Sequence, residues 1–138
     1  MVPPGANFDL LREHPVREVL VQDGAVLVRL GGELDVYNAG VVREALVDAA
    51  RRAGERVVVD LRDVDFIDST LLGVFVESRT NLANRRGFLL ASPGLAVRRA
   101  LEVSGLDRHF EVHESIDSAL DAKLSADSVD GKAANGST

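Results

Sequence analysis

The sequence predicts an α/β fold: a single domain built on a mixed sheet of four to five strands with about four helices. Short apolar runs alternate with segments of helical periodicity, and an Asp-Gly pair separates the first two runs, as is typical of a β-hairpin. Aromatic residues make up only 4% of the chain, so the core is expected to consist of Val, Leu, Ile and Ala. Such a core favours layered packing of helices on a sheet.

The first two elements are expected to form a hairpin. Residues 16–21 and 25–30 are apolar runs that we expect to pair as antiparallel strands through the turn at 23–24. The glycine pair at 31–32 is expected to end the second strand.

The middle of the chain predicts a helix, a central strand and a second helix. Asn38 is a plausible N-cap for the first helix, and Gly54 is expected at its left-handed C-terminal cap. The run 57–61 barely alternates, which indicates a strand covered on both faces. A helix over residues 69–84, stopped by Gly87, follows.

The last third predicts two more strand–helix units. Residues 88–91 form a strand, and the Ser-Pro pair at 92–93 is expected to start a helix that Gly105 ends. Residues 110–113 are expected to form an edge strand, and a final helix spans about 115–124. The order is β-β-α-β-α-β-α-β-α, with parallel neighbours joined by helices.

Composition also suggests where the domain begins and ends. Residues 1–14 show no sustained periodicity and are expected to form a flexible leader, while residues 15–124 form the domain. Residues 125–138 have little to bury and are expected to be disordered.

Charge and composition exclude several classes of partner. The net charge of −6 argues against nucleic acid or an anionic membrane as the main partner. No apolar run reaches the roughly 18 residues of a membrane span, and neither a secretory signal nor a cysteine is present, so a cytoplasmic protein is expected. Three basic pairs are expected to be solvated helix faces: Arg51-Arg52, Arg85-Arg86 and Arg98-Arg99.

The most informative stretch is the approach to Ser69, at the predicted start of the second helix. Free N–H groups and the helix dipole favour an anion there. Four carboxylates are expected to crowd this approach: Asp60, Asp63, Asp65 and Asp68. Ser69 can be a helix N-cap, a phosphate acceptor or both, since the two roles are compatible. Asp68 is either stabilised by the helix dipole, or it orients the serine or meets a basic group of a partner.

Three motifs resemble one family. They are Gly-Glu-Leu-Asp ending at Asp35, Phe-Ile-Asp-Ser-Thr ending at Thr70, and Ser-Gly-Leu at 104–106. With their spacing, they resemble the STAS domain, and more closely the free-standing bacterial anti-sigma-factor antagonists.

This resemblance implies a non-catalytic regulator that binds an anti-sigma factor which is also a serine kinase, and so releases a sigma factor. The kinase would phosphorylate Ser69, with Thr70 as the fallback acceptor, and a phosphatase of the PPM type would reverse it. No cofactor is implied. The implied partner surface comprises Asp35, Asp68, Ser69, Thr70 and Leu71.

Leu71 departs from the family pattern, which has glycine there. Its bulk is expected either to enlarge an apolar docking spot beside the hydroxyl or to block a kinase. The alternative function is therefore a STAS scaffold or ligand-binding module that is never phosphorylated.

Other chemistry is poorly supported. The acidic run does not guarantee the convergent ligands of a magnesium site, and Asp60 and Asp63 are expected to face solvent or to cap. His14, His109 and His113 are expected on the surface, away from any nucleophile motif. A phospho-aspartate receiver would need a late lysine in the sheet, which this chain lacks.

Overall fold

The computed structural model describes residues 14–125. The expected leader over 1–14 and the expected tail over 125–138 therefore lie outside the described residues, apart from His14 and Ser125.

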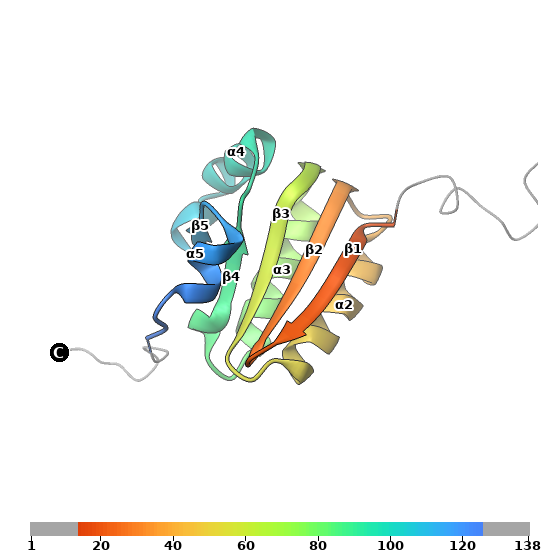
Figure 1. The fold of residues 1–138 in the computed structure, drawn as a ribbon. Coiled ribbons are helices and arrows are strands. Elements are labelled where there is room, and N and C mark those ends of the chain that lie inside the picture. The colour runs from red at the N-terminus through yellow and green to blue at the C-terminus, as the bar shows by residue number, and fades with distance from the viewer. Residues whose placement is uncertain (1–13, 126–138) are drawn as a thin grey trace, which may run out of the picture.

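Within that range the chain forms one five-stranded mixed sheet in the order β1-β2-β3-β4-β5 (Figure 1). β1 and β2 are antiparallel, and the other neighbours are parallel, which confirms the predicted sheet. The strands are β1 (Val16–Gln22), β2 (Ala25–Leu34), β3 (Arg56–Ile67), β4 (Phe88–Ala91) and β5 (Glu111–His113). Asp23 and Gly24 have φ angles of 44° and 83° and form the predicted tight turn.

Among residues 14–125, four helices pack on the two faces of this sheet, most of them on one face. They are α2 (Ala39–Arg52), α3 (Ser69–Asn81), α4 (Leu95–Ser104) and α5 (Ile116–Asp121), with short 3₁₀ turns η1 (Arg85–Gly87) and η2 (Leu106–Arg108). Helices α2 and α3 lie side by side behind the sheet in Figure 1. They share one core with α4, whereas α5 covers part of the opposite face.

Three aromatic rings gather at one place in the main core. Phe75, Phe88 and Phe110 have ring centroids 5.9–6.4 Å apart, and at most 4% of each residue is exposed. Tilted and edge-on contacts at these distances are favourable. The rings join α3 to the starts of β4 and β5.

Two strands run further than the sequence predicts. β2 continues through Gly31 and Gly32 to Leu34, so the expectation that the glycine pair ends it is wrong. β3 likewise continues past Leu61 to Ile67. The two strands pair along these extensions with register shifts that absorb the irregular backbone, including a φ of 78° at Gly32.

Several helix ends also differ from expectation. α2 ends at Arg52 with Ala53 as an extended cap, so Gly54 is not its left-handed cap. Asn38 precedes α2 but makes no capping hydrogen bond. α3 ends at Asn81, before the predicted 84.

Ser92 and Pro93 do not start α4, whose N-cap is Gly94. Ser92 instead donates its N–H to the carbonyl of His113 at 2.9 Å, which extends the pairing of β4 with β5. Gly105 does end α4 in the left-handed conformation. Ser115 is the N-cap of α5, which ends at Asp121, before the predicted end at about 124.

Candidate functional site

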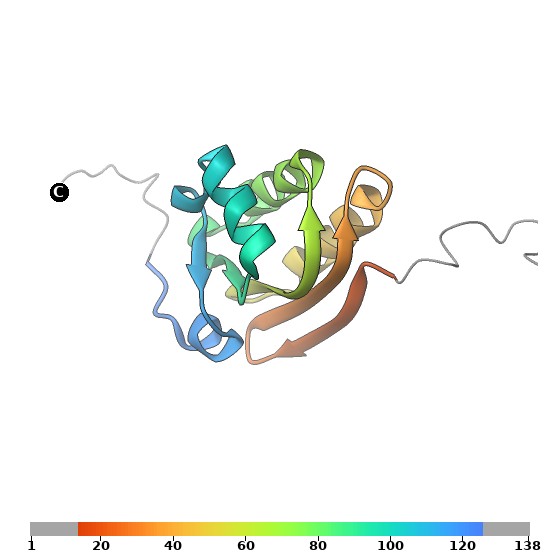
Figure 2. The ribbon, with the colours of Figure 1, turned by 90° about the horizontal axis from the view of Figure 1, so that it is seen from above.

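The paired ends of β2 and β3 bring two predicted site residues to the same edge of the sheet. Leu34 and Ile67 are register partners at the ends of these parallel strands, and Asp35 and Asp68 follow them. The N–H of Asp68 donates to the carbonyl of Leu34 at 3.1 Å, which ties the start of α3 to the end of β2. Figure 2 looks onto this edge, around which the β2–α2 loop, the start of α3 and α4 lie.

Helix α3 is capped by an aspartate, so the hydroxyl of its first residue takes no part in capping. Asp68 is the N-cap, and its carboxylate accepts a hydrogen bond from the N–H of Leu71 at 3.2 Å. The interpretation of Ser69 as the N-cap is therefore wrong. Ser69 and Thr70 are both exposed, and within residues 14–125 the Ser69 hydroxyl makes no hydrogen bond.

Leu71 lies in the core and not on the surface. Leu71 is 0% exposed, and it packs in the main hydrophobic core together with Phe75. The expectation that its side chain enlarges an exposed apolar spot, or adds bulk beside the Ser69 hydroxyl, is wrong. The reason is the direction of α3, which turns its third residue toward the sheet while its first two face solvent.

Asp35 holds a short ordered loop between β2 and α2. Its carboxylate accepts the N–H of Tyr37 at 3.0 Å, and its own N–H donates to the side-chain oxygen of Asn38 at 2.9 Å. Asn38 also donates to the carbonyl of Glu33 at 2.8 Å. These bonds give the loop a defined shape beside the start of α3.

Exposed apolar side chains accompany these polar groups, and sequence reasoning missed them. Tyr37 is 82% exposed, Val36 59% and Phe66 49%. Val36 and Tyr37 lie in a loop, where apolar side chains cannot pack into the core. Apolar residues in a predicted loop were therefore the sequence signal that could have identified this surface. We define the Ser69 surface as Asp35, Val36, Tyr37, Phe66, Asp68, Ser69 and Thr70.

A family model described as the STAS domain matches residues 17–119. The chain belongs to the STAS domain family. It is 35% identical over 100 residues to an anti-sigma F factor antagonist of Paenibacillus polymyxa, a match covering 70% of this chain and 85% of that protein. It is 36% identical over 91 residues to the anti-sigma-B factor antagonist of Bacillus subtilis, covering 64% and 82%.

Solved structures agree with the match to the STAS domain. The crystal structure of an anti-sigma factor antagonist from Mycobacterium paratuberculosis superimposes with a TM-score of 0.69 at 29% identity, covering 75% of this chain and 88% of that one. The predicted resemblance is thereby confirmed.

The acidic residues of this STAS domain do not gather at Ser69 as expected. Because β3 runs on to Ile67 at about 3.3 Å per residue, Asp60 lies roughly 20–25 Å along the strand from the start of α3. Of the four carboxylates, Asp68 is the one that contacts the first turn of α3.

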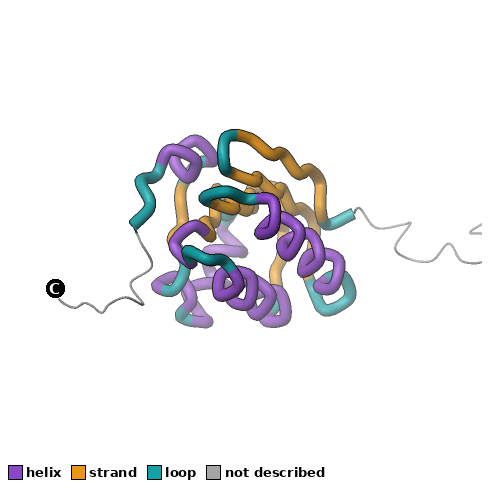
Figure 3. Tube along the Cα trace, turned by 90° about the horizontal axis from the view of Figure 1, so that it is seen from below, coloured by secondary structure: helices purple, strands orange, loops and turns teal. Residues whose placement is uncertain are grey.

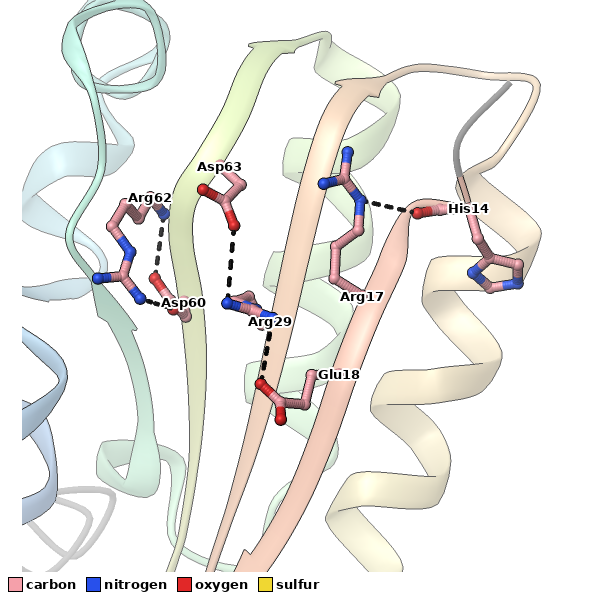
Figure 4. A network of polar contacts seen from close by, with 7 residues as sticks. All are labelled: His14, Arg17, Glu18, Arg29, Asp60, Arg62 and Asp63. Atoms are coloured by element: carbon pink, nitrogen blue, oxygen red, sulfur yellow. Dashed lines mark hydrogen bonds and ion pairs between the residues drawn. The ribbon is translucent and has the colours of Figure 1, made fainter. Parts of the chain in front are cut away.

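Asp60 and Asp63 belong instead to a polar network on the sheet face opposite α2 and α3 (Figure 4). Asp60 is 0% exposed; it accepts the N–H of Arg62 at 3.0 Å and pairs with its guanidinium at 3.4 Å. Arg29 pairs with Glu18 at 3.2 Å and lies 3.9 Å from Asp63. Asp60 thus neither faces solvent nor caps a helix, and its expected exposure is wrong.

The histidines of the STAS domain are dispersed. His14 and His109 are exposed, but the side chain of His113 is only 14% exposed and contacts Ser118 at 2.8 Å and Glu111 at 2.7 Å. Among residues 14–125 no three His, Asp or Glu side chains are placed to hold a metal ion. In that same range no helix has the length and apolar character needed to cross a membrane.

Proposed function

We propose that this STAS protein is an anti-sigma-factor antagonist that docks through the Ser69 surface on an anti-sigma factor with serine kinase activity. Docking releases the sigma factor, and phosphorylation of Ser69 reverses it. The protein acts in the cytoplasm as a non-catalytic regulator. The observation that carries the proposal is the exposed Ser69 hydroxyl, unbonded within residues 14–125, at the start of a helix that Asp68 already caps.

The composition of the Ser69 surface supports a protein partner. Exposed Val36, Tyr37 and Phe66 supply apolar area, and tyrosine is enriched where interfaces carry most of their binding energy. Asp35 and Asp68 make the surface acidic, so the complementary partner surface is basic.

The same arrangement explains how a phosphate would switch the complex off. Phosphorylation adds about −1.5 to −2 charges at pH 7. At Ser69 that charge lies next to the Asp68 carboxylate and in the middle of the docking surface, where mismatched charges cost several kcal/mol. The free N–H groups of the first turn of α3 favour the phosphate, so the modified domain stays folded.

Mass spectrometry after incubation with ATP and the cognate kinase tests the proposal. The intact mass is expected to rise by about 80 Da, one phosphate, and a phosphatase of the PPM type should reverse this. Ser69→Ala should remain unlabelled and Thr70→Ala should be labelled normally. Equal labelling of Ser69→Ala would show that Ser69 is not the acceptor.

A binding assay with the anti-sigma factor separates docking from modification. Ser69→Ala is expected to bind within about threefold of wild type, because the hydroxyl is small and unbonded in residues 14–125. Ser69→Asp should bind at least tenfold more weakly. Tight binding of the aspartate form would contradict the switch.

The alternative function is a STAS module that is never phosphorylated. The argument for it was that the bulk of Leu71 would block a kinase. Since the Leu71 side chain lies in the core, that reason for preferring it is gone. A stable complex with a partner that has no kinase activity, together with unmodified Ser69 under all growth conditions, would revive it.

A further inference from the structure

A cavity of about 230 Å³ opens at the end of the sheet where the parallel strands begin. Its walls come from the last turn of α3, both 3₁₀ turns and the start of β5, and their polar side chains are Arg79, Arg85, Arg86, Arg108, His109 and Glu111. Phe88 and Phe110 line its inner side. Figure 3 views the molecule from this end.

The charge of this cavity is opposite to that of the chain. Four arginines and one carboxylate line it among the described residues, although the whole chain carries a net charge of −6. The carboxylate, Glu111, contacts the ring of His113 at 2.7 Å. Within residues 14–125 the guanidinium groups of Arg86 and Arg108 have no acidic partner.

Arg85 and Arg86 were expected on a solvated helix face; Arg86 is exposed as expected, but the pair lies outside α3. They belong to the short turn η1 and meet Arg79 and Arg108, which come from other elements, around one hollow. Arg79 and Arg85 have other interactions in the protein, so among the described residues the uncompensated charge is that of Arg86 and Arg108. Gathering like charges raises the energy of the folded protein unless a counter-charge is bound. The cluster is therefore expected to stabilise a bound anion.

We propose that this arginine cavity binds a small soluble phosphate compound, either inorganic phosphate or a phosphomonoester. Planar guanidinium groups donate paired hydrogen bonds to phosphate oxygens, and several can share one phosphate group. The volume favours a small ligand, since sites for drug-sized molecules usually measure about 300–1,000 Å³.

This site is separate from the Ser69 surface. Ser69 is the first residue of α3 and Arg79 lies in its last turn, so the two sites stand at opposite ends of one helix. Ligand binding in the cavity does not depend on the proposed partner or on phosphorylation.

Titrations of the ¹⁵N-labelled full-length protein followed by NMR test the proposal. Inorganic phosphate and glycerol 3-phosphate are added in separate arms at constant ionic strength, with sodium chloride as the control. Saturable shifts are expected at the amides of Arg86, Arg108, His109 and Glu111, and not at Ser69 or Thr70. Saturation by glycerol 3-phosphate at lower concentration than inorganic phosphate would identify the phosphomonoester as the preferred form.

A matched pair of variants controls for net charge. Arg86→Gln/Arg108→Gln should weaken phosphate binding at least about tenfold, since each substitution removes charge-assisted hydrogen bonds to the phosphate. Arg51→Gln/Arg99→Gln removes the same charge from exposed helix positions and should bind as wild type does. Thermal unfolding verifies that both variants fold.

Three results would overturn the proposal. They are shifts that grow linearly without saturation, shifts of equal size with sodium chloride, and equal weakening in both double variants. Each would mean that the arginines attract anions only as a diffuse charge.

Discussion

The carboxylate of Asp68 accepts the N–H of Leu71 at 3.2 Å across the first turn of α3. This bond joins the exposed end of the sheet to the core, because Asp68 follows the end of β3 while the Leu71 side chain is fully buried. It leaves Ser69 and Thr70, which lie between them, facing solvent.

Replacing Asp68 with alanine is expected to lower the free energy of unfolding by about 1 kcal/mol, the usual loss for an N-cap. Asp68→Asn should retain most of the stability because its side-chain oxygen can still accept the bond. Urea denaturation measures both, and Asp65→Ala, at an exposed strand position, is the control. If Asp65→Ala lowers the free energy of unfolding as much as Asp68→Ala does, loss of the N-cap is not the cause.

Replacing Leu71 with glycine is expected to be strongly destabilising. Emptying a fully buried leucine site costs about 2–5 kcal/mol, and glycine in a helix costs about 1 more than alanine. Urea denaturation of Leu71→Gly should therefore show a loss of at least 3 kcal/mol. Leu95→Ala, at a residue that is 74% exposed, should change stability by less than about 0.5 kcal/mol.

Ser69→Asp is expected to leave the fold intact or to stabilise it by about 0.3–1 kcal/mol, because a negative charge at a helix N-terminus is favourable. Ser104→Asp places the same charge at the last residue of α4 and should destabilise it. Thermal unfolding compares the two. The proposed switch requires that a negative charge at Ser69 weakens docking without unfolding the domain. Marked destabilisation by Ser69→Asp would contradict this requirement.

Two glycines are expected to respond oppositely to alanine. A Cβ at Gly73 would meet no atom within 4 Å, so Gly73→Ala should stabilise α3 by roughly 0.5–1 kcal/mol. A Cβ at Gly87 would overlap the carbonyl oxygen of Glu55, so Gly87→Ala should cost about 1–3 kcal/mol. Urea denaturation measures both, and stabilisation by Gly87→Ala would contradict the close approach of η1 to β3.

His109 is an exposed residue, yet partial desolvation of its ring, and then the charge of Arg79, lower its pKa below the ordinary value of 6.5. The unfolded chain therefore takes up this proton first as the pH falls. Stability associated with His109 is complete above about pH 6.5 and declines below it. The charged groups around His109 in the arginine cavity are Arg79, Arg85, Arg86, Arg108 and Glu111.

NMR titration of the His109 ring measures this pKa directly. Arg79→Gln is expected to raise it, and bound phosphate should raise it further, since an anion favours the charged ring. In thermal unfolding, His109→Gln should lose less stability than wild type between about pH 7.5 and pH 5.5. A His109 pKa at or above 6.5 in the wild-type protein would show that desolvation and Arg79 do not act on the ring as described.

The sequence was sufficient to predict the element types because the apolar periods are strong. The predicted strand ends were wrong where pairing with a neighbouring strand overrode the local preference of the residues. Gly31 and Gly32 discourage a strand locally, yet β3 offers them hydrogen bonds along its whole length. Likewise Asp63 lies within β3, where Arg29 stands 3.9 Å from its carboxylate, instead of in an acidic loop.

The candidate site could be predicted only in part. The motif located Ser69 at the start of a helix, but which residue capped the helix depended on where β3 ended. The burial of Leu71 depended on how α3 is rotated against the sheet. The arginine cavity could not be foreseen, because Arg79, Arg86 and Arg108 come together only when three separate segments meet.

The length of α3 sets how the two ends of the domain influence each other. Arg79 lies ten positions after Ser69 in α3, which at a rise of 1.5 Å per residue amounts to about 15 Å. This exceeds the Debye length of about 8 Å at physiological salt, so charge gained at one end is largely screened at the other. A phosphate at Ser69, as proposed, and an anion in the arginine cavity, as proposed, would therefore have little electrostatic effect on each other.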